Sequence, residues 1–92
     1  MPADANVADT LGWVLYRKNI PVAAIPLFRE AIGQLEDGSR VRPLIRFHLA
    51  QAYELNGQLA EAIAEIEGIL AESPNFSGRP EAEALLKQLQ ES

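Results

Sequence analysis

Few side chains in this sequence are of types that carry out chemistry. It contains a single histidine, His48, and no cysteine, which excludes cysteine catalysis, thiolate metal sites and disulfides. One imidazole supplies one metal ligand, whereas a zinc site needs three or four protein ligands. His48 follows Phe47 in a stretch of helix-forming residues, so we interpret it as a partly exposed helical residue. Contact with a bound peptide is the alternative interpretation.

Carboxylates are the other groups that could form a site. Several glutamates fall in the second half of the chain: Glu54, Glu61, Glu65, Glu67 and Glu72. Their spacing does not match a calcium-binding loop, and glutamates on helices are usually solvated charges of an outer face. The sequence also lacks an HExxH motif and a glycine-rich phosphate loop. We therefore predict a protein that is not an enzyme and that holds no cofactor and no metal.

Composition and charge narrow the class further. The chain has 92 residues, of which 48% are apolar, enough for one folded domain. Its net charge of -5, without a basic cluster, argues against binding to nucleic acid. No apolar run approaches the roughly 18 residues of a membrane span, and the first ten residues do not resemble a signal peptide. We expect no membrane insertion. The compartment stays open between the cytoplasm and, for a piece of an exported protein, the periplasm.

The elements that position these residues are helices. Apolar residues recur at intervals of three and four, and no stretch alternates with a period of two. Turn-forming residues interrupt the pattern at 18–21, 36–40, 56–57 and 72–80, which divides the chain into five helices joined by short loops. Such loops favour antiparallel neighbours, so the predicted fold class is all-α. Pro26 lies inside the second helix, where we expect a slight bend rather than an end.

The first two helices and the next two are similar in sequence. When the chain is shifted by 38 residues, Leu11 falls on Leu49 and Gly12 on Ala50, and Ala24 falls on Ala62. The helix breaks coincide as well, which is typical of an internal repeat. Small residues at matched places indicate the points where the two helices of each unit cross closely. A plain helical bundle with accidental self-similarity is the alternative.

These positions resemble the tetratricopeptide repeat, and in particular the C-terminal repeats of a bacterial protein of that family. The first unit carries Leu11, Gly12, Leu15, Ala24, Phe28 and Ala31, and the second carries Leu49, Ala50, Tyr53, Gly57, Ala62, Ile66 and Pro74. The resemblance implies a short right-handed solenoid in which these residues pack the repeats. Its units would be residues 5–38 and 43–76, followed by a capping helix at 79–91.

The chain departs from the family pattern at a few places. Asn19 stands where the family has an inter-helix glycine, and Glu36 stands where it has a closing proline. The unit repeats after 38 residues rather than the family's usual 34 or so, which predicts a longer loop at 36–42. Ile69 occupies a position where the family prefers alanine.

The resemblance also implies a function, which is to bind a peptide or a partner helix in a concave groove. The family's groove positions fall here on Asn6, Asp9, Trp13, Tyr16 and Arg17, and on Leu44, Phe47, His48, Gln51, Glu54 and Leu55. Trp13 and Phe47 would form the main aromatic contact, although Trp13 could instead pack between the units. The basic clamp with which some co-chaperone repeats hold an acidic C-terminus is missing, so such a ligand is disfavoured.

Other functions fit the same fold. The chain could be the terminal structural cap of a longer repeat array, or an accessory domain of an enzyme encoded elsewhere in a parent chain. Nothing polar covers the first helix at the N-terminal end, where Val7 and Val14 present an apolar face. We therefore also predict a homodimer through this uncapped N-terminal face.

Overall fold

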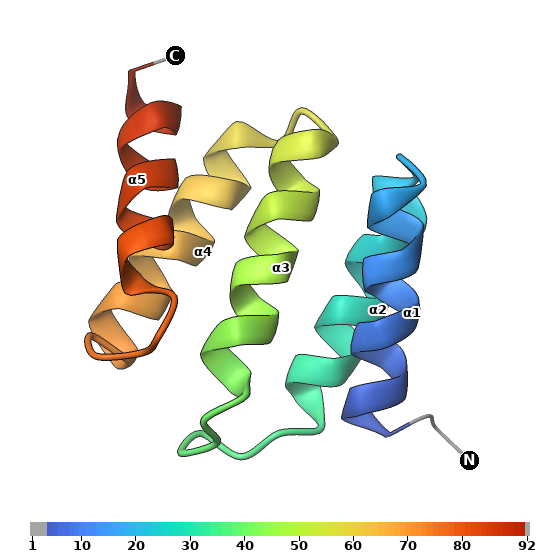
Figure 1. Ribbon diagram of the computed structural model, residues 1–92. Helices are drawn as coiled ribbons and strands as arrows, with labels where there is room; N and C mark the ends of the chain where they lie inside the picture. The colour runs from blue at the N-terminus through green and yellow to red at the C-terminus, as the bar shows by residue number, and fades with distance from the viewer. Residues whose placement is uncertain (1–3, 92) are drawn as a thin grey trace.

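The computed structural model describes residues 4–91 and is built from helices joined by short loops (Figure 1). The helices are α1 (Ala5–Arg17), α2 (Pro21–Gly33), α3 (Arg42–Leu55), α4 (Leu59–Glu72) and α5 (Arg79–Gln90). The described part of the chain contains no strand. The prediction of an all-α chain of five helices is therefore confirmed. α2 continues through Pro26 without an end.

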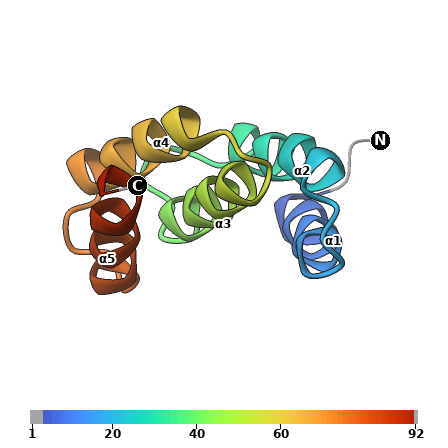
Figure 2. The same ribbon diagram turned by 90° about the horizontal axis from the view of Figure 1, so that it is seen from above.

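The helices form two layers along one direction. Figure 2 shows α2 and α4 in one layer and α1, α3 and α5 in the other, with α1 and α5 at opposite ends. Each helix packs mainly against its neighbours in sequence, whereas α1 and α3 touch only at a few places. Contact between successive hairpins alone is the arrangement of a solenoid.

The two inter-helix turns have the same backbone structure. Asn19 and Gly57 both have positive φ angles, of 64° and 79°, a conformation that glycine adopts freely and asparagine tolerates. The hydrogen bonds are equivalent too: the amide of Ile20 donates to the carbonyl of Leu15, and that of Gln58 to Tyr53. Each pair is related by the 38-residue shift, so the repeat seen in the sequence is also a repeat of the backbone.

α3 lies between two hydrophobic clusters and contributes to both. The first cluster joins α1, α2 and α3 through Ala8, Ala24, Phe28, Ala31, Ile45, Leu49 and Ala52. The second joins α3, α4 and α5 through Ala50, Ala62, Ile66, Ala82 and Leu89. Residues 45, 49 and 52 of α3 thus face α2, while Ala50 faces α4. Both faces of α3 are covered, and the molecule has no single centre.

Gly12 lies where α1 packs tightly against Phe28 of α2. A Cβ atom at this position would lie 2.8 Å from Cε1 of Phe28, whose side chain is fully buried. In the second unit the same two places hold Ala50 and Ile66, both fully buried. Glycine at position 12 leaves space for the large ring of Phe28, whereas the smaller Ile66 leaves space for the methyl group of Ala50. Gly12 and Phe28 of the first unit thus form a matched pair of volumes, as Ala50 and Ile66 do in the second.

Substitution of Gly12 by alanine should destabilise the protein although it removes a helical glycine. Helix propensity favours alanine by roughly 1 kcal/mol, but overpacking a fixed aromatic ring costs about 1–3 kcal/mol. We expect a net loss of about 1 kcal/mol in the free energy of unfolding, measured by urea denaturation. The double variant Gly12→Ala, Phe28→Ile copies the pair of the second unit and should destabilise less than the sum of its single substitutions.

Gly68→Ala is the matched control, since Gly68 also lies inside a helix. A Cβ atom there would meet the guanidinium of Arg46, with Nη2 at 2.5 Å, at the far end of a flexible side chain whose ion pairs with Glu65 and Glu72 can rearrange. We expect Gly68→Ala to unfold with a free energy close to that of the wild type, because the gain of roughly 1 kcal/mol in helix propensity offsets any weakening of these ion pairs. An unfolding free energy of Gly12→Ala as high as that of Gly68→Ala would contradict the packing argument.

Candidate functional site

The face formed by α1, α3 and α5 carries most of the predicted groove residues. Figure 2 shows these three helices on the same side of the molecule, away from α2 and α4. On α3, Leu44, His48, Gln51 and Leu55 follow one another at intervals of four, three and four, which places them along one helical stripe. Leu44 and Leu55 are exposed at its ends, and His48 and Gln51 are partly buried between them. We call these four residues the α3 stripe.

Between α1 and α3, a polar pair lies among aromatic rings. Nδ1 of His48 lies 2.8 Å from Oδ1 of Asp9, a distance at which an Nδ1–H group donates a hydrogen bond to the carboxylate. The imidazole ring also lies 4.5 Å from the ring of Trp13 and 5.6 Å from that of Phe28, between centroids. His48 therefore joins the two repeats by one hydrogen bond and two ring contacts.

Trp13 packs at this junction and remains partly exposed. Its ring stacks on that of Tyr16 with centroids 4.9 Å apart and planes 15° apart, and both residues border the first hydrophobic cluster. Packing between the units is one of the two roles that the sequence allows for Trp13. Since one part of the indole stays accessible, packing leaves room for contact with a ligand.

Phe47 lies elsewhere, against the second cluster together with Leu85 and Leu86 of α5. The structure therefore does not bring Phe47 together with Trp13, whose ring partners are Tyr16 and His48. The shift of 38 residues explains the difference, because it relates Phe47 to Asp9. This position on the first helix of a hairpin faces the helix that follows the hairpin, so Asp9 faces α3 and Phe47 faces α5.

The remaining predicted groove residues are spread along the same helices. Glu54 of α3 is partly buried, and Arg17 at the end of α1 is exposed. Asn6 borders a shallow hollow on the outer side of α1. Leu11, which the repeat pattern assigns to packing, is exposed within this chain, whereas its counterpart Leu49 is buried. The difference arises because Leu49 packs against α2, whereas none of the described helices covers Leu11 on the outer face of α1.

Ion pairs join α3 and α4, and the sequence analysis did not predict them. Arg46 reaches across Gly68 and binds Glu65 through Nε at 2.5 Å and Glu72 through Nη1 at 2.6 Å. Glu72 also accepts a bond from Arg42 at 3.0 Å. Two of the glutamates interpreted as solvated charges are therefore paired. Gly68, a glycine in the middle of a helix, is the sequence signal that marks such a close approach.

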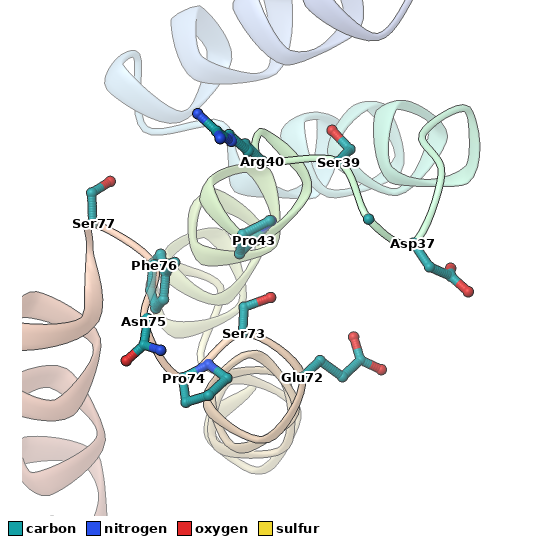
Figure 3. A pocket seen from close by; sticks show the side chains of 11 residues that line it. Asp37, Ser39, Arg40, Pro43, Glu72, Ser73, Pro74, Asn75, Phe76 and Ser77 are labelled. Carbon is teal, nitrogen blue, oxygen red and sulfur yellow. The ribbon is translucent and has the colours of Figure 1, made fainter.

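A hollow at the loop end of the molecule was also unpredicted. It has a volume of about 510 Å³ and is lined by residues 37–40 of the α2–α3 loop, Pro43 of α3, and residues 72–77 after α4. Figure 3 shows Pro43, Pro74 and Phe76 around the opening, with Asp37 and Ser39 on the loop opposite. The spacing of residues along the sequence does not predict this hollow, because two loops that are distant in sequence form it.

Tyr16 is the titratable group of this site with a shifted pKa. Burial, with a smaller contribution from the negative charge of Glu54, raises the pKa of Tyr16 above its ordinary value of about 10. Both causes disfavour the phenolate, so the side chain keeps its proton at neutral pH and remains a hydrogen-bond donor.

The shifted pKa gives the stability of the protein a dependence on alkaline pH. The folded chain holds the Tyr16 proton more tightly than the unfolded chain, so this stabilisation is complete below about pH 10 and is lost as the pH rises through the folded pKa. We expect the free energy of unfolding to fall more steeply from pH 9.5 to 11 in the wild type than in Tyr16→Phe. Urea titrations at several pH values measure it. Parallel curves for the two proteins would refute this assignment.

The described residues also bear on metal binding and on membrane insertion. Among residues 4–91, no three His, Cys, Asp or Glu side chains gather as they would around a metal ion. None of the helices described here has both the length and the hydropathy to cross a membrane.

Comparison with known proteins identifies a family model that covers most of the chain. Residues 19–89, more than half of the chain, match a protein-family model described as tetratricopeptide repeat. The matched span begins at the turn after α1 and ends within α5. Neither the comparison with curated proteins nor that with solved structures gives a match.

Proposed function

The chain belongs to the tetratricopeptide repeat family, and from this premise we propose that it binds a peptide or a partner helix on the face of α1, α3 and α5. Repeats of this family generally mediate protein–protein interactions, and the family is typically non-enzymatic. The observation that carries the proposal is the α3 stripe. It is the central strip of the face, and its two leucines are exposed although both sides of α3 are otherwise covered.

The chemistry of the stripe defines the kind of partner. Leu44 and Leu55 are eleven residues apart, or about 16 Å along a helix, and the polar side chains of His48 and Gln51 lie between them. A matching segment presents two apolar side chains at that distance, with hydrogen-bonding groups between them. Trp13 and His48 are already held in place by their contacts with Tyr16 and Asp9, which lowers the entropic cost of binding.

The alternatives concern the place of this chain in a larger protein. A terminal cap of a longer array is supported by α5, which covers α4 with Ala82 and Leu89 and exposes Glu81, Glu83 and Lys87. On this division, residues 5–38 and 43–76 are the two repeats and residues 79–91 form the cap. An accessory domain of an enzyme would use the same α3 stripe toward its own catalytic domain.

The outer face of α1 is a second surface for a partner. Val7, Leu11 and Val14 are exposed there, and none of the other helices in residues 4–91 covers them. We propose that a second copy of the chain covers this face, so that the protein forms a homodimer while the α3 stripe stays free for another partner.

Selection from a random peptide library tests the proposed peptide-binding face. Peptides that bind the wild type should bind Leu44→Glu and Leu55→Glu at least about tenfold more weakly, since a buried carboxylate opposes apolar contact. The matched control is Leu59→Glu on α4, at a leucine that is 39% exposed compared with 36% for Leu44. Binding to this control should be unchanged.

The position of a bound peptide gives an independent readout. In ¹H–¹⁵N spectra of the wild type, we expect the largest shifts at the amides of α3 and of residues 9–16. Shifts concentrated in residues 37–40 and 72–77 would move the binding site to the loop hollow and overturn the proposed face.

A further inference from the structure

The apolar face of α1 has the composition of a buried face but lies at the surface. Val7, Leu11 and Val14 are 53%, 48% and 43% exposed, and together with Asp4, Asn6 and Thr10 they line a shallow hollow of about 460 Å³. Three neighbouring branched side chains on one exposed helix are more than the isolated apolar residues of an ordinary surface.

The internal repeat shows what such a face packs against. The 38-residue shift relates Val7, Leu11 and Val14 to Ile45, Leu49 and Ala52, all of which are buried at the first cluster. Those residues of α3 pack on α2 through Ala24, Phe28 and Ala31. The equivalent face of α1 therefore has the geometry to receive a helix along its length.

Charges at its two ends indicate which helix this is. Asp4, Val7, Leu11, Val14 and Lys18 follow one another at intervals of three, four, three and four residues, the spacing of a helix-pairing seam. We call these five residues the α1 seam. Asp4 and Lys18 are both exposed, so the seam is negative at its beginning, apolar in its middle and positive at its end.

We propose that two copies of this chain pair through their α1 seams in antiparallel orientation. The two-fold axis passes near Leu11, which meets its own copy, and Val7 of one chain packs against Val14 of the other. Asp4 of each chain then lies opposite Lys18 of its partner, because these residues are equally distant from Leu11. This arrangement rests on the proposed homodimer and specifies its contacts.

Other arrangements of two copies are less favourable. A parallel pair would place Asp4 against Asp4 and Lys18 against Lys18, where like charges repel. Head-to-tail stacking would bring α1 of one copy to α5 of the other, which exposes Glu81, Glu83 and Lys87, so that charged side chains would lie against the apolar middle of the seam. The antiparallel pair buries the apolar middle and neutralises both ends.

The mass of the protein in sedimentation equilibrium tests self-association. A single helix from each chain forms a small interface, and interfaces below about 1,200 Å² are typical of weak complexes, so the concentration series should extend to about 1 mM. We expect the mass to rise toward that of a dimer for the wild type and for Leu59→Glu. Leu11→Glu places two carboxylates at the two-fold axis and should remain a monomer.

Charge reversal tests the orientation. Asp4→Lys makes both ends of the seam positive and Lys18→Glu makes both negative, so each variant alone should dimerise about tenfold more weakly than the wild type. An equimolar mixture of the two variants should associate more tightly than either alone, and the double variant should recover the wild-type affinity. Added salt should weaken the mixture. Circular dichroism checks the fold, since the Asp4 side chain also caps α1 through the amide of Val7.

The outcomes separate the two levels of the proposal. A wild-type mass of one chain at every concentration would overturn the homodimer and its arrangement together. A dimer that persists in Leu11→Glu would move the interface away from the α1 seam. A dimer lost in Leu11→Glu, with a mixture of charge variants no tighter than each alone, would keep the interface and overturn the antiparallel orientation.

Discussion

A helical hairpin has more apolar surface than its two helices can cover for each other, and the fold follows from this constraint. α3 shows it most clearly, because residues 45, 49 and 52 pack on α2 while Ala50 packs toward α4. Each hairpin therefore needs a neighbour on both sides. α5 packs on α4 with one apolar side and exposes a charged side, whereas none of the helices described here covers the outer face of α1.

Local rules made the helices and the repeat predictable from the sequence. The spacing of apolar residues indicates which side chains share a face, and turn residues such as Asn19 and Gly57 indicate where helices end. Both are properties of short segments. The 38-residue shift then related Gly12 to Ala50 without any knowledge of the fold.

Contacts between hairpins were harder to predict for a physical reason. The helical period shows that Phe47 belongs to a face, but not which neighbour that face meets, and the structure turns it toward α5 rather than Trp13. The bond from His48 to Asp9 joins residues 39 positions apart and depends on the packing angle of two repeats. The ion pairs of Arg46 depend on how a long, flexible side chain folds over Gly68. Backbone periodicity contains none of this information.

The first hairpin combines a glycine with a large ring, Gly12 with Phe28, and the second combines an alanine with a smaller side chain, Ala50 with Ile66. This difference has a consequence for the evolution of such proteins. Each pair fills the space at its helix crossing. A hybrid that combines the alanine of one unit with the phenylalanine of the other would be overpacked there. Duplication or recombination that copies a whole hairpin keeps each pair together, whereas a junction between the two helices of a hairpin separates it. The heritable module in this chain is therefore the complete hairpin, because a chimaera joined at its tight turn would begin with a clash if it paired Ala50 with Phe28, or with a void if it paired Gly12 with Ile66.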